Sequence, residues 1–332
     1  ALTAVTSASY NTALGNGALT ANTTGASNTA SGHYSLLTNI SGSNNSAYGA
    51  NSLRLNTTGA NNTSVGYESL RANTTGADNV AIGIYSLDIN STGANNTAVG
   101  SAALGSNTTA SNNTAVGYQA LNANTTGTYN TAVGALALDA NTTASYNTAM
   151  GYYALSSETL GARNVAIGHE TLASQNFTSA TDSYNTAVGM AAGRLVTTGV
   201  NNTFIGGNAG TANTTGADNV AVGKGALATN TTGASNTAIG RDSLERNTTG
   251  ADNTAIGRAS MEDNTTGVQN VAIGRNALNN NTTGEQNTAV GREALKSNTT
   301  AVRNTAVGTS ALTTNTTGND NTALGKDAMS AN

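Results

Sequence analysis

The chain has 332 residues, of which 9% are charged and 4% aromatic, with 39 Gly and no Pro, Cys or Trp. Average globular proteins carry about 25% charged residues, so this is not an ordinary globular chain. The formal net charge of −4 is too small for charge-driven disorder and gives no reason to expect nucleic acid as a partner. The absence of Cys excludes disulfides and Cys-based metal sites, and no run of about 20 apolar residues predicts a membrane-spanning helix.

One pentapeptide, Asn-Thr-Ala-Val-Gly with small variations, recurs through the whole sequence. It begins at Asn11 and returns every 17 residues as far as Asn164, and then every 17 residues from Asn185 to Asn321. The single longer step, from Asn164 to Asn185, contains four additional residues near 175–179. This period, held over 19 copies, predicts a repeat protein, and we expect one continuous domain over residues 1–332.

Each repeat follows the pattern N-T-A-V-G-x-x-A-L-x-x-N-T-T-G-A-x, with Asn at position 1 and Gly at position 5 in every copy. The unit is too short for a helix pair, and Asn, Thr and Gly are poor residues for helix interiors. We therefore expect an all-β parallel β-solenoid, or β-roll, of about 19 coils. Strands are predicted at positions 1–4 and 12–14, with a turn at each Gly. Coils stacked about 4.8 Å apart predict a rod of roughly 90 Å.

Alternation along the first strand assigns its side chains to two faces. Thr or Val at position 2 and Val, Ile or Leu at position 4 are predicted to face the core, together with Leu at position 9. Ala at position 3 then faces outward, and its constancy predicts packing against another copy of the chain; the alternative is that Ala merely fits a tight coil. The predicted self-association face comprises Ala13, Ala47, Ala81, Ala98, Ala115, Ala132, Ala149, Ala187, Ala221, Ala238, Ala255, Ala272, Ala289 and Ala306.

Two Asn positions recur, and position 1 is predicted to form a ladder that hydrogen-bonds to neighbouring coils and to turn backbone. Position 12 opens Asn-Thr-Thr or Asn-Ser-Thr, a glycosylation acceptor in a secretory context. Because acceptors in adjacent coils would lie about 4.8 Å apart, we expect partial or no occupancy, with a second Asn ladder as the alternative. An Asn/Thr face would also suit ice or crystalline polysaccharide. The candidate glycosylation sites are Asn22, Asn56, Asn73, Asn90, Asn107, Asn124, Asn141, Asn213, Asn230, Asn247, Asn264, Asn281, Asn298 and Asn315.

Position 6 becomes basic in the second half of the chain. Asp242, Glu293 and Asp327 stand beside these cations at position 7. The pattern predicts either a solvated, partly paired ladder that discourages wrong lateral association, or a cationic stripe for anionic polysaccharide or another fibre. The ladder comprises Lys224, Arg241, Arg258, Arg275, Arg292 and Lys326.

Nothing in the sequence predicts catalysis. The two histidines, His33 and His169, are eight coils apart at position 6, which is too far for a shared metal or proton. Acidic residues are too sparse for a calcium-binding β-roll, and no Gly-rich loop precedes a helix. We expect no catalytic residue, metal or cofactor, and we expect that the protein is not an enzyme.

The segments Asn96–Gly100 (Asn-Thr-Ala-Val-Gly) and Asn79–Gly83 (Asn-Val-Ala-Ile-Gly) resemble the repeats in the heads of trimeric autotransporter adhesins. The Ala-Leu and Asn-Thr-Thr-Gly segments between them resemble repeats of phage tail-fibre-like and bacterial surface proteins. The resemblance implies a left-handed parallel β-roll, three chains side by side, and adhesion at an extracellular surface.

These observations predict an extracellular structural or adhesive rod, at a cell or virion surface, that assembles by coil stacking and lateral packing. The expected partner is the chain itself, as a trimer or a head-to-tail fibre, and surface polysaccharide is a further candidate; no nucleic acid and no membrane insertion are expected. The alternatives are a receptor-binding shaft of a phage fibre or trimeric adhesin, and an ice- or glycan-binding solenoid. Both ends lie in repeat register without an evident capping coil, so we expect either a piece of a longer protein or subunits that stack end to end.

The additional residues interrupt an otherwise regular array. Gln175, Asn176 and Phe177 are predicted to form a bulge that is either a contact point or a tolerated loop.

Overall fold

The computed structural model describes residue 4 and residues 6–331. The chain is an all-β parallel β-solenoid of about 18 turns with a repeat of about 17 residues, as the sequence predicts. Contacts divide it into two compact units: unit 1 extends to Asn164 and includes Asn176–Asp182, and unit 2 comprises Val165–Gln175 and the residues from Ser183 onward. Within the described residues there is no helix of the length and apolarity that a membrane crossing requires.

Each repeat contributes one three-residue strand, at positions 2–4, and strands of successive repeats pair in parallel with residues of the same position opposite each other. The strands of unit 1 are β1 (Thr12–Leu14), β2 (Thr29–Ser31), β3 (Ser46–Tyr48), β4 (Thr63–Val65), β5 (Val80–Ile82), β6 (Thr97–Val99), β7 (Thr114–Val116), β8 (Thr131–Val133) and β9 (Thr148–Met150). Those of unit 2 are β11 (Val165–Ile167), β13 (Thr186–Val188), β14 (Thr203–Ile205), β15 (Val220–Val222), β16 (Thr237–Ile239), β17 (Thr254–Ile256), β18 (Val271–Ile273), β19 (Thr288–Val290), β20 (Thr305–Val307) and β21 (Thr322–Leu324).

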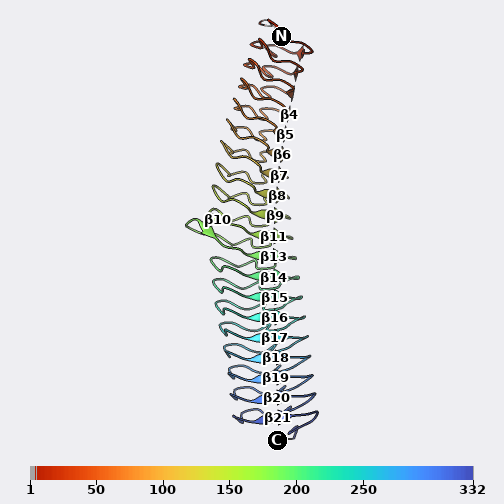
Figure 1. The fold of residues 1–332 in the computed structure, drawn as a ribbon, viewed down its shortest axis with the longest axis vertical. Helices are drawn as coiled ribbons and strands as arrows, with labels where there is room; N and C mark the ends of the chain where they lie inside the picture. The colour runs from red at the N-terminus through yellow and green to blue at the C-terminus, as the bar shows by residue number, and fades with distance from the viewer. Residues whose placement is uncertain (1–3, 5, 332) are drawn as a thin grey trace. The chain divides into compact units, whose positions relative to one another are not determined.

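Unit 1 contains two further short strands at the insertion. These strands, β10 (Gly161–Ala162) and β12 (Thr181–Asp182), pair with each other in parallel. In Figure 1, β4–β9 lie one above the next, and β10 lies to the side of this ladder. The insertion therefore leaves the main strand register of unit 1 intact and adds a small sheet beside it.

The second strand predicted at positions 12–14 is not formed, because the chain bends there in every regular coil. The segment is still joined to the next coil. The backbone N–H of Thr57 donates to Thr74 O at 2.8 Å, and Thr57 Oγ1 donates to the same oxygen at 2.9 Å. Hydrogen bonds of this kind recur at position 13, so Thr ties the bend to the neighbouring coil without a strand.

Four positions of the coil have left-handed backbone. Gly at position 5 has φ between +119° and +147° throughout, which confirms the turn predicted there. Positions 7, 9 and 17 also have positive φ, as in Gln119 (+53°), Leu121 (+53°) and Asn112 (+62°). Non-Gly residues rarely adopt this conformation, and only Gly at position 5 gave a signal in the sequence. These left-handed residues turn the chain sharply, so that 17 residues close one coil around a narrow core.

The core consists of positions 3, 8 and 9, with Asn at positions 1 and 12. In the coil that begins at Asn113, the side chains of Ala115, Ala120 and Leu121 are fully buried. The prediction that positions 2 and 4 face the core is wrong, since Thr114 and Val116 are partly exposed and Ile82 is 39% exposed. Strand alternation then assigns Ala at position 3 to the interior. A Val or Ile side chain there would overfill a space already packed by one Leu per coil.

One coil breaks this rule in a compensated way. Phe204 replaces Ala at position 3 and is fully buried, while Gly193 and Gly210 replace Leu at position 9. A Cβ on Gly210 would lie 2.5 Å from Phe204 Cδ1, and one on Gly193 would lie 2.8 Å from Phe204 Cδ2. The aromatic ring therefore occupies the space that two Leu side chains would fill.

Candidate functional site

Asn at position 1 forms the predicted ladder inside each unit. The backbone N–H of Asn130 donates to Asn113 Oδ1 at 2.9 Å, and Asn113 Nδ2 donates to Gly127 O at 2.9 Å. Each Asn thus closes its own coil with its amide nitrogen and holds the next coil with its amide oxygen. The constancy of position 1 follows from these two bonds, which require a short side chain with both a donor and an acceptor.

Asn at position 12 forms a second buried ladder. Asn124 Nδ2 donates to Asn107 Oδ1 at 3.1 Å and to Gly127 O at 3.0 Å. The amide nitrogen that would carry a glycan is buried and bonded, so position 12 forms the Asn ladder that was the alternative, and the described coils of the folded chain expose no glycan acceptor there. This holds for Asn22, Asn56, Asn73, Asn90, Asn107, Asn124, Asn141, Asn213, Asn230, Asn247, Asn264, Asn281 and Asn298, which are fully buried, and for Asn315, which is 5% exposed.

The Asn/Thr face considered for ice or crystalline polysaccharide does not include Asn, because Asn at position 12 is buried. Of the segment at positions 12–14, the exposed rank is Thr at position 14, as in Thr58, Thr126 and Thr249. Thr at position 13 is only partly exposed in most coils, and its hydroxyl donates to backbone of the next coil. A single rank of hydroxyls per unit therefore replaces the broad face that the sequence suggested.

The predicted Ala face is also wrong. Its side chains point into the coil, so they cannot contact a second chain. Ala13 is partly exposed, and all the others are fully buried: Ala47, Ala81, Ala98, Ala115, Ala132, Ala149, Ala187, Ala221, Ala238, Ala255, Ala272, Ala289 and Ala306. Their constancy reflects the narrow interior, which was the alternative explanation.

The outward side of each strand ladder carries one rank of mainly Thr and one mainly apolar rank, and we call this surface the strand face. It consists of Thr, Val or Ser at position 2 and mainly Val or Ile at position 4. Ile82 in unit 1 and Ile205, Ile239 and Ile273 in unit 2 are between 38% and 41% exposed. No residue at positions 2 or 4 of the strands carries a charge. Each unit therefore has an uncharged surface along its strand ladder, with an apolar rank at position 4 beside a rank of mainly Thr at position 2.

The basic ladder of unit 2 is exposed and partly paired. Arg241 lies 3.0 Å from Asp242, Arg292 lies 3.9 Å from Glu293, and Lys326 lies 3.7 Å from Asp327. Position 7 thus supplies the partners that the sequence predicted. Exposed pairs of this kind contribute little stability, but they reduce the repulsion between cations stacked in successive coils. Burial, together with the charges of Asp242 and Glu262, raises the pKa of Glu245 nearby.

The insertion in unit 1 is held by a buried carboxylate. Glu158 replaces Asn at position 12, and its Oε1 accepts hydrogen bonds from the backbone N–H groups of Leu160, Gly161 and Phe177. The ring of Phe177 is 6% exposed and lies against Gly161, where a Cβ would approach its Cδ2 to 2.7 Å. The inserted segment is therefore anchored by both polar and apolar contacts.

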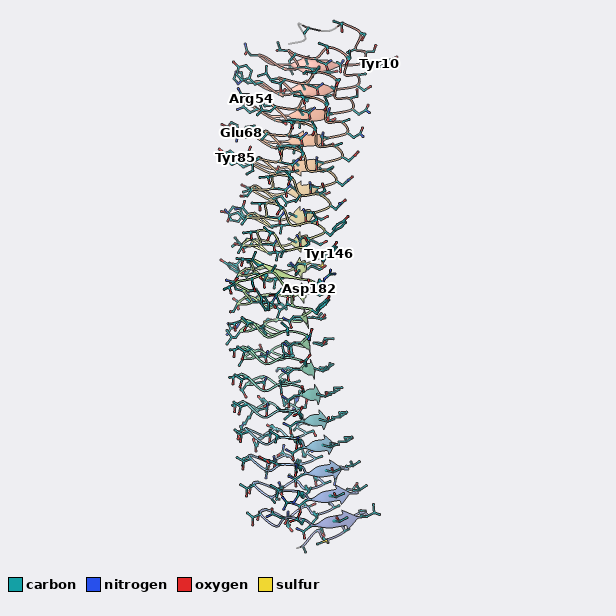
Figure 2. All side chains as sticks on the ribbon, turned by 60° about the vertical axis from the view of Figure 1, so that its left-hand side comes forward. Tyr10, Arg54, Glu68, Tyr85, Tyr146 and Asp182 are labelled. Carbon is teal, nitrogen blue, oxygen red and sulfur yellow. The ribbon has the colours of Figure 1, made fainter. Side chains whose placement is uncertain are left out.

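A short ladder of three long side chains at position 17, Tyr129, Tyr146 and Arg163, lies directly before the insertion in unit 1. The rings of Tyr129 and Tyr146 stack with centroids 5.3 Å apart and planes 2° from parallel. Arg163 Cζ lies 4.8 Å from the centroid of Tyr146, and Arg163 Nε lies 3.1 Å from Asp182 Oδ1. Figure 2 shows Tyr146 and Asp182 at neighbouring levels on one side of unit 1, opposite Arg54, Glu68 and Tyr85.

An open hollow of about 440 Å³ lies beside this ladder. Its lining comes from positions 14–17 of successive coils and from β10 and β12: Thr143, Ala144, Ser145, Tyr146, Leu160, Ala162, Arg163, Ala180, Thr181 and Asp182. Reasoning from the sequence missed this site. The signal was present, since two consecutive Tyr and one Arg occupy a position that is mostly Asn, Asp or Ser elsewhere, directly before the insertion.

The titratable residues of the described chain do not gather into a metal-binding group of three or more His, Asp or Glu side chains. His33 is exposed, and its ring lies 3.7 Å from that of Tyr34. His169, in unit 2, is exposed as well.

Comparison with protein-family models finds no family that matches this chain. Comparison with curated proteins finds no matching protein.

Proposed function

We propose that the protein is a structural rod that packs side by side with copies of itself through the strand face, and that it serves as an adhesive fibre at an extracellular surface. The strand face is the observation that carries this proposal. Parallel sheets are nearly always covered on both faces, and contiguous exposed apolar surface marks sites of association. In each unit the interior covers one side of the ladder, and the uncharged ranks at positions 2 (mainly Thr) and 4 (mainly Val or Ile) occupy the other.

The repeat argues for a second copy as the partner. The strand face presents the same residue types once per coil, at the strand spacing of about 4.8 Å. Another copy of this chain has the same spacing and the same uncharged ranks, so side chains can remain in register along the whole contact. The resemblance to trimeric adhesin heads supports three chains around a common axis, display at a cell or virion surface, and adhesion. The proposal includes no catalytic step.

Mass per unit length, measured by scanning transmission electron microscopy, tests the lateral packing. The mass of 32.8 kDa over 332 residues, with one 17-residue coil per roughly 4.8 Å, gives about 0.35 kDa per Å for one chain and about 1 kDa per Å for three. We expect the value for three chains. A value for one chain would overturn lateral packing and would favour end-to-end stacking alone.

Charge on the strand face provides the matched variants. Val99→Lys combined with Val116→Lys places like charges on two adjacent strands of unit 1, and should reduce the mass per length to the single-chain value. Thr109→Lys combined with Thr126→Lys adds the same charge to the same coils at position 14, and should leave assembly unchanged. Equal effects of the two pairs would contradict the assignment of the interface to the strand face.

A further inference from the structure

We propose that the hollow beside Tyr146 and Asp182 in unit 1 binds a neutral saccharide, as a short stretch of a longer glycan. This site lies at positions 14–17 and at the insertion, away from the strand face. It therefore goes beyond the proposed self-association and does not depend on it.

The size and lining of the hollow suit a sugar. Its volume of about 440 Å³ falls within the roughly 300–1,000 Å³ of small-ligand sites. Small apolar side chains (Ala144, Leu160, Ala162) alternate around it with hydroxyl groups (Ser145, Thr181). A pyranose ring has the same combination of C–H groups and hydroxyls. Thr181 Oγ1 donates to Ser179 O and Ser145 Oγ accepts from the Thr128 N–H, so each hydroxyl oxygen keeps a lone pair to which a sugar hydroxyl can donate.

The charged groups of the lining favour a neutral ligand. The ion pair between Arg163 and Asp182, with Nε 3.1 Å from Oδ1, contributes no net charge. The attraction of either an anionic or a cationic ligand to one member of the pair is offset by repulsion from the other, so the pair gives no net preference for a charged ligand. A guanidinium group and a carboxylate are also planar groups with paired donors or acceptors, and such groups match the adjacent hydroxyls of a sugar.

The site is held in place before any ligand binds. Tyr129 stacks on Tyr146, and Arg163 covers Tyr146 from the following coil, so the two side chains that border the hollow support each other. On the other wall, Glu158 binds the backbone N–H groups of Leu160 and Gly161. Rigid sites lose less conformational entropy on binding, which favours recognition of a flexible glycan.

Affinity electrophoresis tests the proposal. Native gels would contain hydroxyethylcellulose, soluble starch, galactomannan or dextran as neutral probes, and alginate as an anionic probe. Mobility is normalised to a gel without polysaccharide, so that charge changes in variants do not affect the comparison. We expect at least one neutral probe to retard the wild-type protein.

Two variants act on the hollow in opposite ways. Tyr146→Ala removes a wall of the hollow, and Thr143→Trp, at an exposed position, fills it. Each should weaken retardation by about tenfold or more, the loss typical of a central contact. Tyr118→Ala is the matched control, since Tyr118 is 55% exposed but lies at position 6, outside the lining.

The outcomes separate cleanly. Retardation by a neutral probe that both hollow variants lose and Tyr118→Ala keeps would support the site. No retardation by any neutral probe, retardation by alginate alone, or equal loss in the control would overturn it. Because Thr143→Trp adds a side chain at the surface and removes none of the stacked ring contacts, the test does not depend on the folding of Tyr146→Ala.

Discussion

Gly recurs at positions 5 and 15 of the repeat, but only Gly at position 5 has left-handed backbone. Replacing one Gly at each position by Ala, beginning with Gly257→Ala, tests this difference. Gly257, at position 5 in unit 2, has φ of +132°. A Cβ there would lie 2.7 Å from both Gly274 C and Gly274 O in the next coil. Backbone strain of this kind costs about 1–3 kcal/mol, and overpacking adds about 1–3 kcal/mol. We therefore expect the substitution to destabilise its coil by about 2–6 kcal/mol.

Gly250→Ala is the matched control at position 15, seven residues earlier in the same unit. A Cβ on Gly250 would crowd Asn247 Oδ1 and Gly267 O, but its φ lies outside the left-handed region. The chain itself contains Ala301 at the equivalent position, buried and still bonded, with Asn298 Nδ2 3.2 Å from Ala301 O against 2.9 Å from Asn247 Nδ2 to Gly250 O. We expect a smaller loss than at Gly257, about 0–2.6 kcal/mol, because the overpacking cost of about 1–3 kcal/mol carries no left-handed strain and Ala also restricts the unfolded chain by about 0.4–1 kcal/mol.

Amide hydrogen exchange followed by mass spectrometry is the appropriate assay. A repeat array unfolds locally, so a single free energy of unfolding is not well defined for the whole chain. Since each 1.4 kcal/mol is a factor of ten, Gly257→Ala should lower the protection of its own and the adjacent coils by roughly tenfold to ten-thousandfold. Coils several repeats away should be unaffected. Equal loss of protection in the two variants would refute the argument from backbone conformation.

Two other predictions concern single coils of unit 2. Phe204→Ala should leave a cavity and cost about 3–5 kcal/mol of local stability, whereas adding Gly193→Leu and Gly210→Leu should restore most of it; exchange protection of that coil checks both, and no rescue would contradict the compensation. The pKa of Asp320 lies below its usual value because the Arg303 guanidinium hydrogen-bonds to it. The pair therefore contributes stability above the unfolded pKa of about 3.9, and this contribution is lost as pH falls through the lower folded value. Carboxyl ¹³C NMR should show Asp320 titrating below that range, and titration at the usual pH, or no change in Arg303→Gln, would contradict this.

The period, the fold class and the Asn ladder at position 1 could be predicted because each depends on spacing alone. Which side of the strand faces inward could not be derived from alternation, which separates Ala115 from Val116 but assigns neither to the core. Hydrophobicity favoured Val for the interior, and the width of a 17-residue coil excluded it. The better signal was variability: position 4 accepts Ser31, Tyr48 and Met150, a range that only an open surface tolerates.

The sequon at position 12 misled for a related reason. Asn-Thr-Thr meets the chemical requirement for a glycosylation acceptor, and nothing in the tripeptide reports burial. The discriminating fact lies three residues later, where Asn124 Nδ2 donates to Gly127 O. That carbonyl also accepts from Asn113 Nδ2, so one backbone oxygen joins both ladders of the coil. The coil therefore requires Asn at positions 1 and 12 and a small residue at position 15 together.

At the insertion, Glu158 stands at position 12 in place of Asn, and the Asn ladder is interrupted. At Glu158 the side chain has no amide N–H to continue the ladder, and Asn141 Oδ1 is left buried without a hydrogen-bond partner. Glu158 instead accepts bonds from the backbone of Leu160, Gly161 and Phe177, which holds the inserted segment against the coil. The hollow beside Tyr146 follows from that exchange, since the displaced segment supplies its far wall. The interior positions of the regular coils are nearly invariant, and a distinct site forms where a ladder is interrupted. In chains of this kind, specific binding should therefore be sought at such interruptions.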